Sequence, residues 1–192
     1  MKSINKWIIF SLIWLLPLPL LAENSLVGQS APLINGKNAR DFGLIKLSSL
    51  MKTVYREKNA DGTYREINGQ YVWQVRKNVV VINFFATYCI PCIKEIPTFN
   101  KIAQIYRDRN VKLIYVNVDA KMTLSKLRRL IIKYKISVPM MVPNQSDAVN
   151  KYQVYNLPRI VVIDQEQRIA DLIVGFQEDF ESQMTAIIDE LL

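Results

Sequence analysis

VVVINFFATYCIPC, residues 79–92, joins an apolar run to a pair of cysteines. Residues 79–85 are apolar apart from Asn83 and rich in β-branched types, which is typical of a strand buried on both faces. From residue 90 to residue 109, apolar side chains recur at helical spacing, and Pro97 interrupts the hydrogen-bond ladder. The sequence therefore predicts a central strand and a long helix kinked near Pro97, with both cysteines where the strand gives way to the helix.

The part of the chain after this helix continues the alternation of strands and helices. We expect strands at 112–118, 138–142, 159–164 and 168–175, and helices at 123–135, near 146–152 and at 178–192. A strand, a crossover helix and a second strand, followed by an antiparallel hairpin and a closing helix, form a mixed sheet covered on both faces. The predicted fold class is therefore α/β, with a central mixed β-sheet flanked by helices.

The residues before the central strand carry different signals. Residues 26–50 include several glycines, and we expect a loop there with at most short strands. Between residues 53 and 75, apolar and polar residues alternate around two turn signals, Asn-Ala-Asp-Gly at 59–62 and Asn-Gly at 68–69, which predict a β-hairpin or meander. We expect a structural extension, with a functional loop at the second turn as the alternative. We therefore divide the chain into an N-terminal segment (1–22), an extension with a β-hairpin (23–77) and a main domain (78–192).

The N-terminal segment has the composition of an export signal. Lys2 and Lys6 precede a run from residue 7 to residue 21 that has no charged side chain. The run is shorter than the roughly 20 residues of a bilayer span, and Pro17 and Pro19 disturb a helix in its second half. Cleavage after this run and its retention as a membrane tether both remain open.

Composition excludes several classes of site. The chain has two cysteines, no histidine and a formal charge of +8. A zinc site within one chain needs about four thiolate or imidazole ligands, and a c-type haem site needs a histidine where Ile93 stands, so we expect no metal and no cofactor. No motif supports nucleic-acid binding. The basic residues between 101 and 135 are expected to form a solvated helix face, with contact to anionic lipid or an acidic partner as the alternative.

The position of the cysteines predicts their chemistry. A thiol at a helix N-terminus lies near unpaired N–H groups and the positive end of the helix dipole, which stabilise the thiolate. Cys89 is therefore expected to be the more acidic and more exposed sulfur, and Cys92, one turn later, to resolve a mixed disulfide. Pro91 keeps the loop between them short and lacks an N–H where none is needed. The alternative is a purely structural disulfide, although closing so small a loop adds little stability.

Three segments resemble the TlpA/ResA group of exported thioredoxin-like proteins. Residues 80–97 resemble its active-site segment, residues 27–32 its N-terminal segment, and residues 156–160 the loop before its third core strand. The resemblance implies a thioredoxin-like fold and thiol–disulfide oxidoreductase activity on protein disulfides or dithiols. It also implies an exported protein, in the bacterial periplasm or on the outer face of the inner membrane.

The resemblance further implies a substrate-binding groove. Pro158 is expected to be a cis-proline packed beside Cys89, and the backbone of Leu157 to pair with an extended substrate. Tyr88 and Pro91, which flank the cysteines, are expected to contact the same substrate. The cis geometry is implied by the resemblance alone, because only about 5–6% of X–Pro bonds in folded proteins are cis.

One position is expected to tune the cysteine pair, and several others depart from the family pattern. Glu95 stands where the family carries a glutamate that tunes the cysteine pair, with a solvated first-turn carboxylate as the alternative. Asn83 occupies the place of a buried aspartate that relays protons in thioredoxin. Since an amide cannot titrate, the proton acceptor must be Glu95, water or another group. Phe85 and Tyr88 stand where the family usually has tryptophans, and the insertion at 53–75 matches no subgroup known to us.

Three functions are compatible with these residues: a dithiol–disulfide exchanger, a binding or chaperone module with a structural disulfide, and a peroxidase. Peroxidases of the wider superfamily place their cysteine in a Pro-x-x-x-Thr-x-x-Cys context, whereas Cys89 follows Phe-Ala-Thr-Tyr. Within the first option, the resemblance implies a reductase supplied by a membrane-bound electron donor and serving, for example, cytochrome c maturation. An enzyme that introduces disulfides is the alternative, because redox poise depends on how strongly the thiolate is stabilised.

Overall fold

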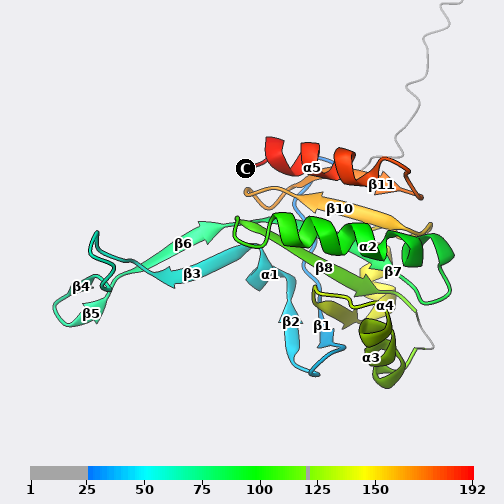
Figure 1. Cartoon of the computed structure of the whole chain (residues 1–192), viewed down its shortest axis with the longest axis horizontal. Coiled ribbons are helices and arrows are strands. Elements are labelled where there is room, and N and C mark those ends of the chain that lie inside the picture. The colour runs from blue at the N-terminus through cyan, green and yellow to red at the C-terminus, as the bar shows by residue number, and fades with distance from the viewer. Residues whose placement is uncertain (1–25, 120–121) are drawn as a thin grey trace, which may run out of the picture.

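The computed structural model of the chain describes residues 26–119 and 122–192. Seven strands make its central sheet: β1 (Asn35–Asn38), β2 (Leu44–Lys46), β7 (Val79–Phe85), β8 (Val111–Asn117), β9 (Met140–Pro143), β10 (Arg159–Ile163) and β11 (Ile169–Val174). Their order is β11-β10-β7-β8-β9-β1-β2 (Figure 1). Because β7 pairs parallel with β8 and antiparallel with β10, the sheet is mixed, as predicted.

β7 is the central strand of this sheet. All seven of its residues are buried, as expected for a strand covered on both faces. In the parallel pair with β8, Val79 lies opposite Val111 and Phe85 lies opposite Asn117. The carboxyl ends of β7 and β8 therefore meet at one edge of the sheet, and the loop that carries the cysteines starts there.

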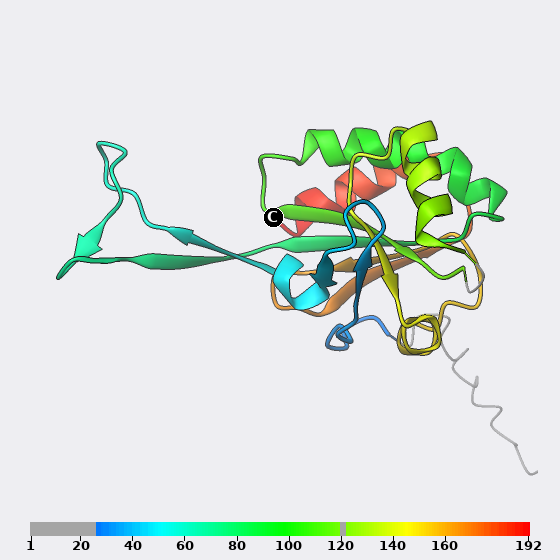
Figure 2. The ribbon, with the colours of Figure 1, turned by 90° about the horizontal axis from the view of Figure 1, so that it is seen from below.

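Helices cover both faces of the sheet. They are α1 (Leu47–Leu50), α2 (Ile90–Ile105), α3 (Leu124–Lys133), α4 (Gln145–Lys151) and α5 (Phe180–Glu190). Figure 2 shows α2, α3 and α5 on one face and α4 on the other. Phe99 of α2 and Met184 of α5 share one buried core, whereas Ala148 of α4 packs into a second core across the sheet. The predicted α/β class is confirmed, and Pro97 lies inside α2.

The segment before residue 51 adds two strands to the sheet. β1 pairs antiparallel with both β9 and β2. Glycine is required at position 36, because a Cβ there would overlap the backbone of Val142 in β9. The sequence predicts at most short strands in this segment, and the two strands have four and three residues. They lie in the same sheet as the strands of residues 78–192.

Residues 52–77 form a projecting ribbon that we call the arm. β3 (Lys52–Arg56) pairs antiparallel with β6 (Trp73–Lys77), and at the far end β4 (Glu66–Ile67) pairs with β5 (Gln70–Tyr71). Both of these two-stranded sheets are separate from the seven-stranded sheet. Figures 1 and 2 show the arm extending away from the body of the molecule. The predicted β-hairpin is confirmed.

The arm leaves and rejoins the body at one place. The backbone N–H of Asn78 donates to the carbonyl of Met51 at 2.9 Å. The side-chain amide of the buried Asn78 donates to the carbonyl of Leu50 at 2.8 Å and to the hydroxyl of Thr53 at 3.0 Å. Asn78 is also the one residue between β6 and β7, so the arm continues directly into the central strand.

The predicted signal or tether, residues 1–22, lies outside the described residues. Among residues 26–119 and 122–192, no helix combines the length and the apolar character that a bilayer span requires.

Candidate active site

The two cysteines lie at the junction of β7 and α2. β7 ends at Phe85, α2 begins at Ile90, and Cys89 is the N-cap of the helix. The Sγ atom of Cys89 accepts a hydrogen bond from the backbone N–H of Cys92 at 3.2 Å, which is the contact that a capping side chain makes. Pro91 lies in the first turn, where helix N–H groups lack an intrahelical partner. The predicted position of the cysteines at a helix start is confirmed.

Cys89 and Cys92 are joined as a disulfide. Cys92 is fully buried, whereas Cys89 is 7% exposed, so a thiol that attacks this bond from solvent reaches Cys89 first. After reduction, the free N–H groups and the dipole at the start of α2 favour the thiolate of Cys89 over its thiol. Cys89 is therefore the more exposed residue of the pair, as the sequence predicts, and Cys92 is the shielded one.

Cys89 faces a cavity of about 420 Å³. The cavity is lined by Tyr88, Cys89, Ile90, Pro91, Tyr155, Asn156 and Leu157. None of these side chains carries a formal charge. Tyr88, Ile90 and Tyr155 are 71%, 68% and 74% exposed, which is unusual for large apolar side chains on a packed domain. The cavity therefore suits an uncharged polypeptide segment.

The loop before β10 forms the other wall of this cavity. The peptide bond between Leu157 and Pro158 is cis, as the resemblance implies. Leu157 lines the cavity together with Cys89, while Pro158 is buried and accepts a hydrogen bond through its carbonyl from the N–H of Gly175 at 2.9 Å. The fold thus brings two segments that are distant in sequence to one cavity, and Tyr88, Cys89, Pro91 and Leu157 of the predicted site meet there.

Glu95 is buried in α2, one turn after Cys92. Only 2% of it is exposed, so the interpretation as a solvated first-turn carboxylate is wrong. The reason is that residues three apart on a helix share a face, and this face of α2 packs onto the sheet together with Cys92. Burial raises the pKa of Glu95 to about 7, and the nearby Asn83 amide, which lowers the pKa, is the smaller influence. At neutral pH the carboxyl group can therefore both accept and release a proton.

Tyr115 joins Asn83 and Glu95 under α2. It lies opposite Asn83 in the parallel pair of β7 and β8. Among the described residues, the Tyr115 hydroxyl, the Asn83 amide and the Glu95 carboxyl oxygens are buried without a hydrogen bond. Burial raises the pKa of Tyr115 well above its usual value, and the charge of Glu95 raises it further. The sequence analysis missed Tyr115, because only the pairing of the two strands shows that it lies beside Asn83.

A second polar contact supports the loop before Cys89. The hydroxyl of Thr87 donates to Oδ2 of the buried Asp119 at 2.6 Å. The side-chain amide of Gln145 donates to the carbonyl of Asp119 at 2.7 Å, which links this point to the start of α4. These contacts fix the backbone that precedes Cys89. The sequence analysis missed them as well, because Thr87 and Asp119 lie on separate loops.

Ligands for a metal ion do not gather in the part of the chain that the structure describes: no three His, Cys, Asp or Glu side chains there are close enough to hold one.

Known proteins match this chain in sequence. The sequence profile of the AhpC/TSA family matches residues 27–172. The thiol-disulfide oxidoreductase ResA of Geobacillus kaustophilus (strain HTA426) is 30% identical over 111 residues, which cover 56% of this chain and 62% of that relative. The match therefore spans less than two thirds of the relative's length.

Solved structures share the fold. A protein from Chlorobium tepidum described as a thiol:disulfide interchange protein DsbE has a TM-score of 0.67 at 18% identity, covering 86% of this chain and 96% of that chain. The thioredoxin domain of a thiol-disulfide oxidoreductase from Bacteroides vulgatus has a TM-score of 0.62 at 17% identity, covering 84% and 97%. At such identities the likeness concerns the fold alone, and the predicted thioredoxin-like fold is confirmed.

Proposed function

The chain belongs to the AhpC/TSA family, and from that premise we propose that it is a thiol–disulfide oxidoreductase in which Cys89 attacks and Cys92 resolves. The predicted likeness to the TlpA/ResA group is confirmed by the match to ResA. One observation carries the proposal: Cys89 is the accessible member of a disulfide at a helix N-terminus, and it faces an uncharged cavity. A disulfide that only stabilised the fold would need neither this exposure nor this cavity.

The exchange takes place in two steps. In the reduced protein, the Cys89 thiolate attacks one sulfur of a client disulfide, so that a mixed disulfide forms and the second client sulfur leaves as a thiolate. Cys92 then gives up its proton and attacks the Sγ atom of Cys89, which breaks the mixed disulfide and releases the client sulfur that Cys89 had attacked. The client gains two electrons, the protein is oxidised, and the product is the Cys89–Cys92 disulfide present in the structure.

Glu95 accepts the proton that Cys92 loses. Its pKa of about 7 lies between that of an ordinary carboxyl group and that of a thiol, which suits transfer in either direction. Asn83, on the adjacent strand, cannot titrate and leaves this role to Glu95. The shared helix face of Cys92 and Glu95 supports the assignment.

The client is an extended polypeptide segment that lies across the cavity. Tyr88 and Pro91 on one side and Leu157 on the other hold it, and the backbone of Leu157, which the buried Pro158 follows, supplies a pairing partner in the manner of an added strand. Because no charged side chain lines the cavity, the residues next to the client cysteine are apolar or aromatic.

Export and the direction of the reaction belong to the same proposal. The protein works outside the cytoplasm, in the bacterial periplasm or on the outer face of the inner membrane, with residues 7–21 as a signal or a tether. It reduces disulfides of exported proteins, as cytochrome c maturation requires, and a membrane-bound dithiol donor returns it to the reduced form. An oxidising space creates the need for such a donor.

The reduction potential of the Cys89/Cys92 pair tests the direction. A value near that of thioredoxin, about −270 mV, is expected, whereas a value near −120 mV would make the protein a disulfide-introducing enzyme. The variant Cys92→Ala should accumulate mixed disulfides with client proteins, and Cys92→Ala combined with Cys89→Ala is the matched control that cannot. If the reduced protein resists alkylation at neutral pH and traps no client, the disulfide is structural and the proposal fails.

A further inference from the structure

The arm exposes a large apolar surface, although Arg56 lies over the rings of Tyr64, Tyr71 and Trp73 within it. None of residues 52–77 is buried. Four aromatic side chains and three aliphatic ones stand 37–60% exposed on it: Tyr55, Tyr64, Tyr71, Trp73, Val54, Ile67 and Val75. A two-stranded ribbon in water is marginally stable unless a third strand or another surface packs against it. The arm is therefore a ribbon that lacks a packing partner within the described chain.

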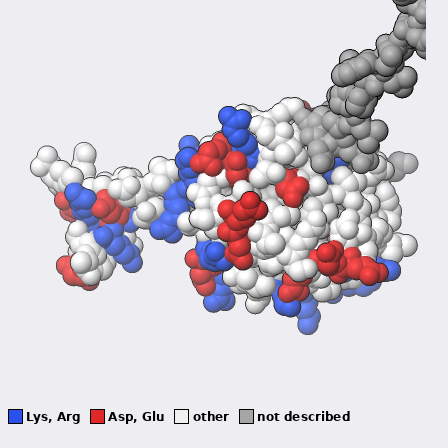
Figure 3. Space-filling view, turned by 90° about the horizontal axis from the view of Figure 1, so that it is seen from above, with Lys and Arg blue, Asp and Glu red and all other residues white. Residues whose placement is uncertain are grey.

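Positive charge dominates this surface. The arm carries six basic and three acidic side chains, and Figure 3 shows Lys and Arg along it and where it meets the body. The carboxylate of Glu57 is already held by Arg65 and Gln74, each at 2.9 Å. Lys58 and Arg76 have no ion pair with any described residue. The arm thus presents cations that its own acidic residues leave uncompensated.

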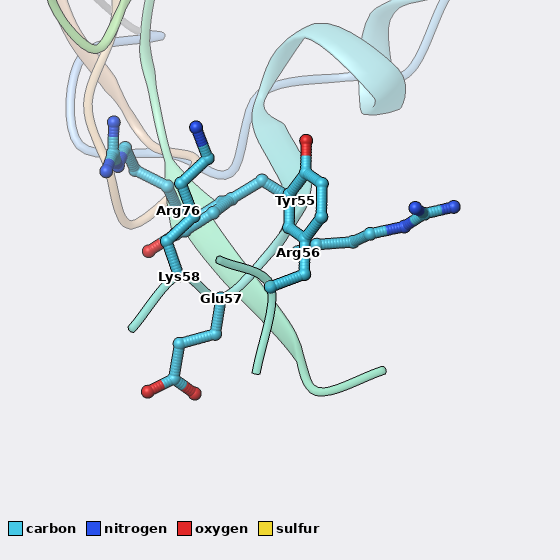
Figure 4. A pocket seen from close by; sticks show the side chains of 6 residues that line it. Tyr55, Arg56, Glu57, Lys58 and Arg76 are labelled. Carbon is cyan, nitrogen blue, oxygen red and sulfur yellow. The ribbon is translucent and has the colours of Figure 1, made fainter. Parts of the chain in front are cut away.

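Two of these cations flank a cavity of about 680 Å³ along the ribbon, from Arg76 of β6 to Lys58 just beyond the end of β3. It is lined by Tyr55, Arg56, Glu57, Lys58, Tyr64 and Arg76 (Figure 4). Arg76 lies 4.8 Å from the centre of the Tyr55 ring, and Lys58 lies 5.6 Å from that of Tyr64. Figure 4 shows the ends of Lys58 and Arg76 on one side and the carboxylate of Glu57 pointing away from them. This is an aromatic and cationic site suited to a carboxylate that carries an apolar neighbour.

We propose that the arm is a docking site for an acidic polypeptide segment, which lies along the ribbon as an added strand and places carboxylates at Lys58 and Arg76. The outer edges of β3 and β6 have no strand partner in the described chain, so their backbone groups are free to pair with such a segment. The charge complementarity selects an acidic partner.

Two other occupants fit the surface less well. An anionic bilayer would receive the tip first, and the tip carries the carboxylates of Asp61 in a turn and Glu66 in β4. A second copy of the arm would bring together two ribbons that are both net positive. A polypeptide uses the free backbone edges, the rings and the cations at once, which neither of the others does.

This docking site is separate from the cysteines and goes beyond the proposed exchange reaction. The arm enters the body at the start of β7, and Cys89 follows the opposite end of that strand, roughly 23 Å away at about 3.3 Å per residue. A partner held by the arm is thus bound at a second point. Binding at the arm raises the local concentration of the partner's other segments near the cavity beside Cys89, although the arm itself does not contact the cysteines.

The test uses the full chain and a synthetic peptide of alternating glutamate and valine, about ten residues long. Hydrogen exchange should slow in residues 52–58 and 72–77 when the peptide binds, and the affinity should fall as salt is raised. The double variant Lys58→Glu with Arg76→Glu should weaken binding about ten-fold or more. The control is Lys126→Glu with Arg129→Glu, an equal charge change on exposed residues of α3. Because salt screens distant charges, the affinity of this variant should stay within about two-fold of that of the unchanged protein.

Several outcomes would overturn the inference. These are unchanged exchange in the arm, equal binding of a lysine–valine peptide, or equal losses in both double variants. Protection of the arm by phosphatidylglycerol vesicles but not by the peptide would assign the surface to lipid, and concentration-dependent protection without peptide would assign it to a second copy. Reduction of a small-molecule disulfide, measured on the same samples, should be unchanged by the arm variants, which separates failure of docking from failure of the exchange chemistry.

Discussion

β7 and the arm that leads into it differ completely in burial. Every residue of β7 is buried, whereas no residue of the arm is. In the packed region each side chain is constrained by neighbours on two faces, so geometry there is specified by the core and holds Cys89 at the start of α2. In the arm, side chains are constrained only by cross-strand neighbours. Packing within the described fold thus explains the residues around the cysteines, whereas it leaves the apolar residues of the arm exposed.

The largest expected effect is on catalysis. Cys89→Ala removes the more exposed member of the cysteine pair, so the rate of disulfide exchange should fall to the uncatalysed background. The double arm variant Lys58→Glu with Arg76→Glu should retain the rate on a small disulfide. A turnover assay with a small-molecule disulfide measures both. Activity that survives in Cys89→Ala would mean that the packed region is not where the chemistry takes place.

The next effect is on folding stability. Phe84→Ala empties a fully buried position in β7, where the ring packs against Tyr152 at 5.2 Å between centroids, and should lower the free energy of unfolding by about 3–5 kcal/mol. Val75→Ala on the arm, at a position that is 60% exposed, should change it by less than about 0.5 kcal/mol. Urea denaturation followed by circular dichroism gives both values. Equal losses would show that the arm is part of the cooperative core.

A third effect appears in the pH dependence of stability. In the folded protein the pKa of Glu95 is raised from 4.5 to about 7. The contribution of the neutral carboxyl group to the free energy of unfolding is therefore fully present below about pH 4.5 and is lost as the pH rises through about 7. The loss amounts to about 3 kcal/mol. Glu95→Gln should remove this slope and also remove the corresponding step from the pH profile of disulfide closure. Unfolding measured across that range, with single-turnover closure of the disulfide, tests both.

Glu57→Gln on the arm is the matched control for this measurement. Hydrogen bonds from Gln74 and Arg65 lower the pKa of Glu57, so its contribution has the opposite sign: it is present at neutral pH and lost in acid. Since Glu57 is solvated, the change should be small. A slope between pH 4.5 and 7 that persists in Glu95→Gln would assign it to another group.

The smallest expected effect compares two threonine hydroxyls. Thr87→Val removes the 2.6 Å hydrogen bond to the buried Asp119 and should cost about 1–2 kcal/mol, with slower attack by Cys89 because the preceding loop loosens. Thr63→Val removes a 2.7 Å hydrogen bond to Asp61 on the exposed arm and should cost less than about 0.5 kcal/mol. Thermal unfolding and the alkylation rate of reduced Cys89 distinguish them. A larger loss at Thr63 would reverse the order on which the comparison rests.

Local patterns made several features predictable. The apolar run at 79–85 and the helical spacing after it indicate β7 and α2, and the two cysteines between them mark the site. Asn-Gly at 68–69 and the alternation around it indicate the hairpin of the arm. The cis bond before Pro158 follows from the resemblance to known sequences, because no local pattern around that proline distinguishes cis from trans.

Other features depend on contacts between distant residues and leave no local pattern. β1 and β2 are too short to show a period, and their place in the sheet depends on pairing with β9, about a hundred residues later in the chain. The burial of Glu95 is hidden because a carboxylate on a helix is usually solvated. The proximity of Tyr115 to Asn83 follows only from the register of two strands.

The hydrogen bond from Asn78 to Met51 has one more consequence. Since the chain departs for the arm and returns from it at neighbouring backbone atoms, residues 52–77 are a module whose two junctions a short turn can bridge. Such a segment can be excised, exchanged between homologues or grafted onto another thioredoxin scaffold without shifting the register of the sheet, and evolution can change what this protein associates with while its sulfur chemistry stays as it is.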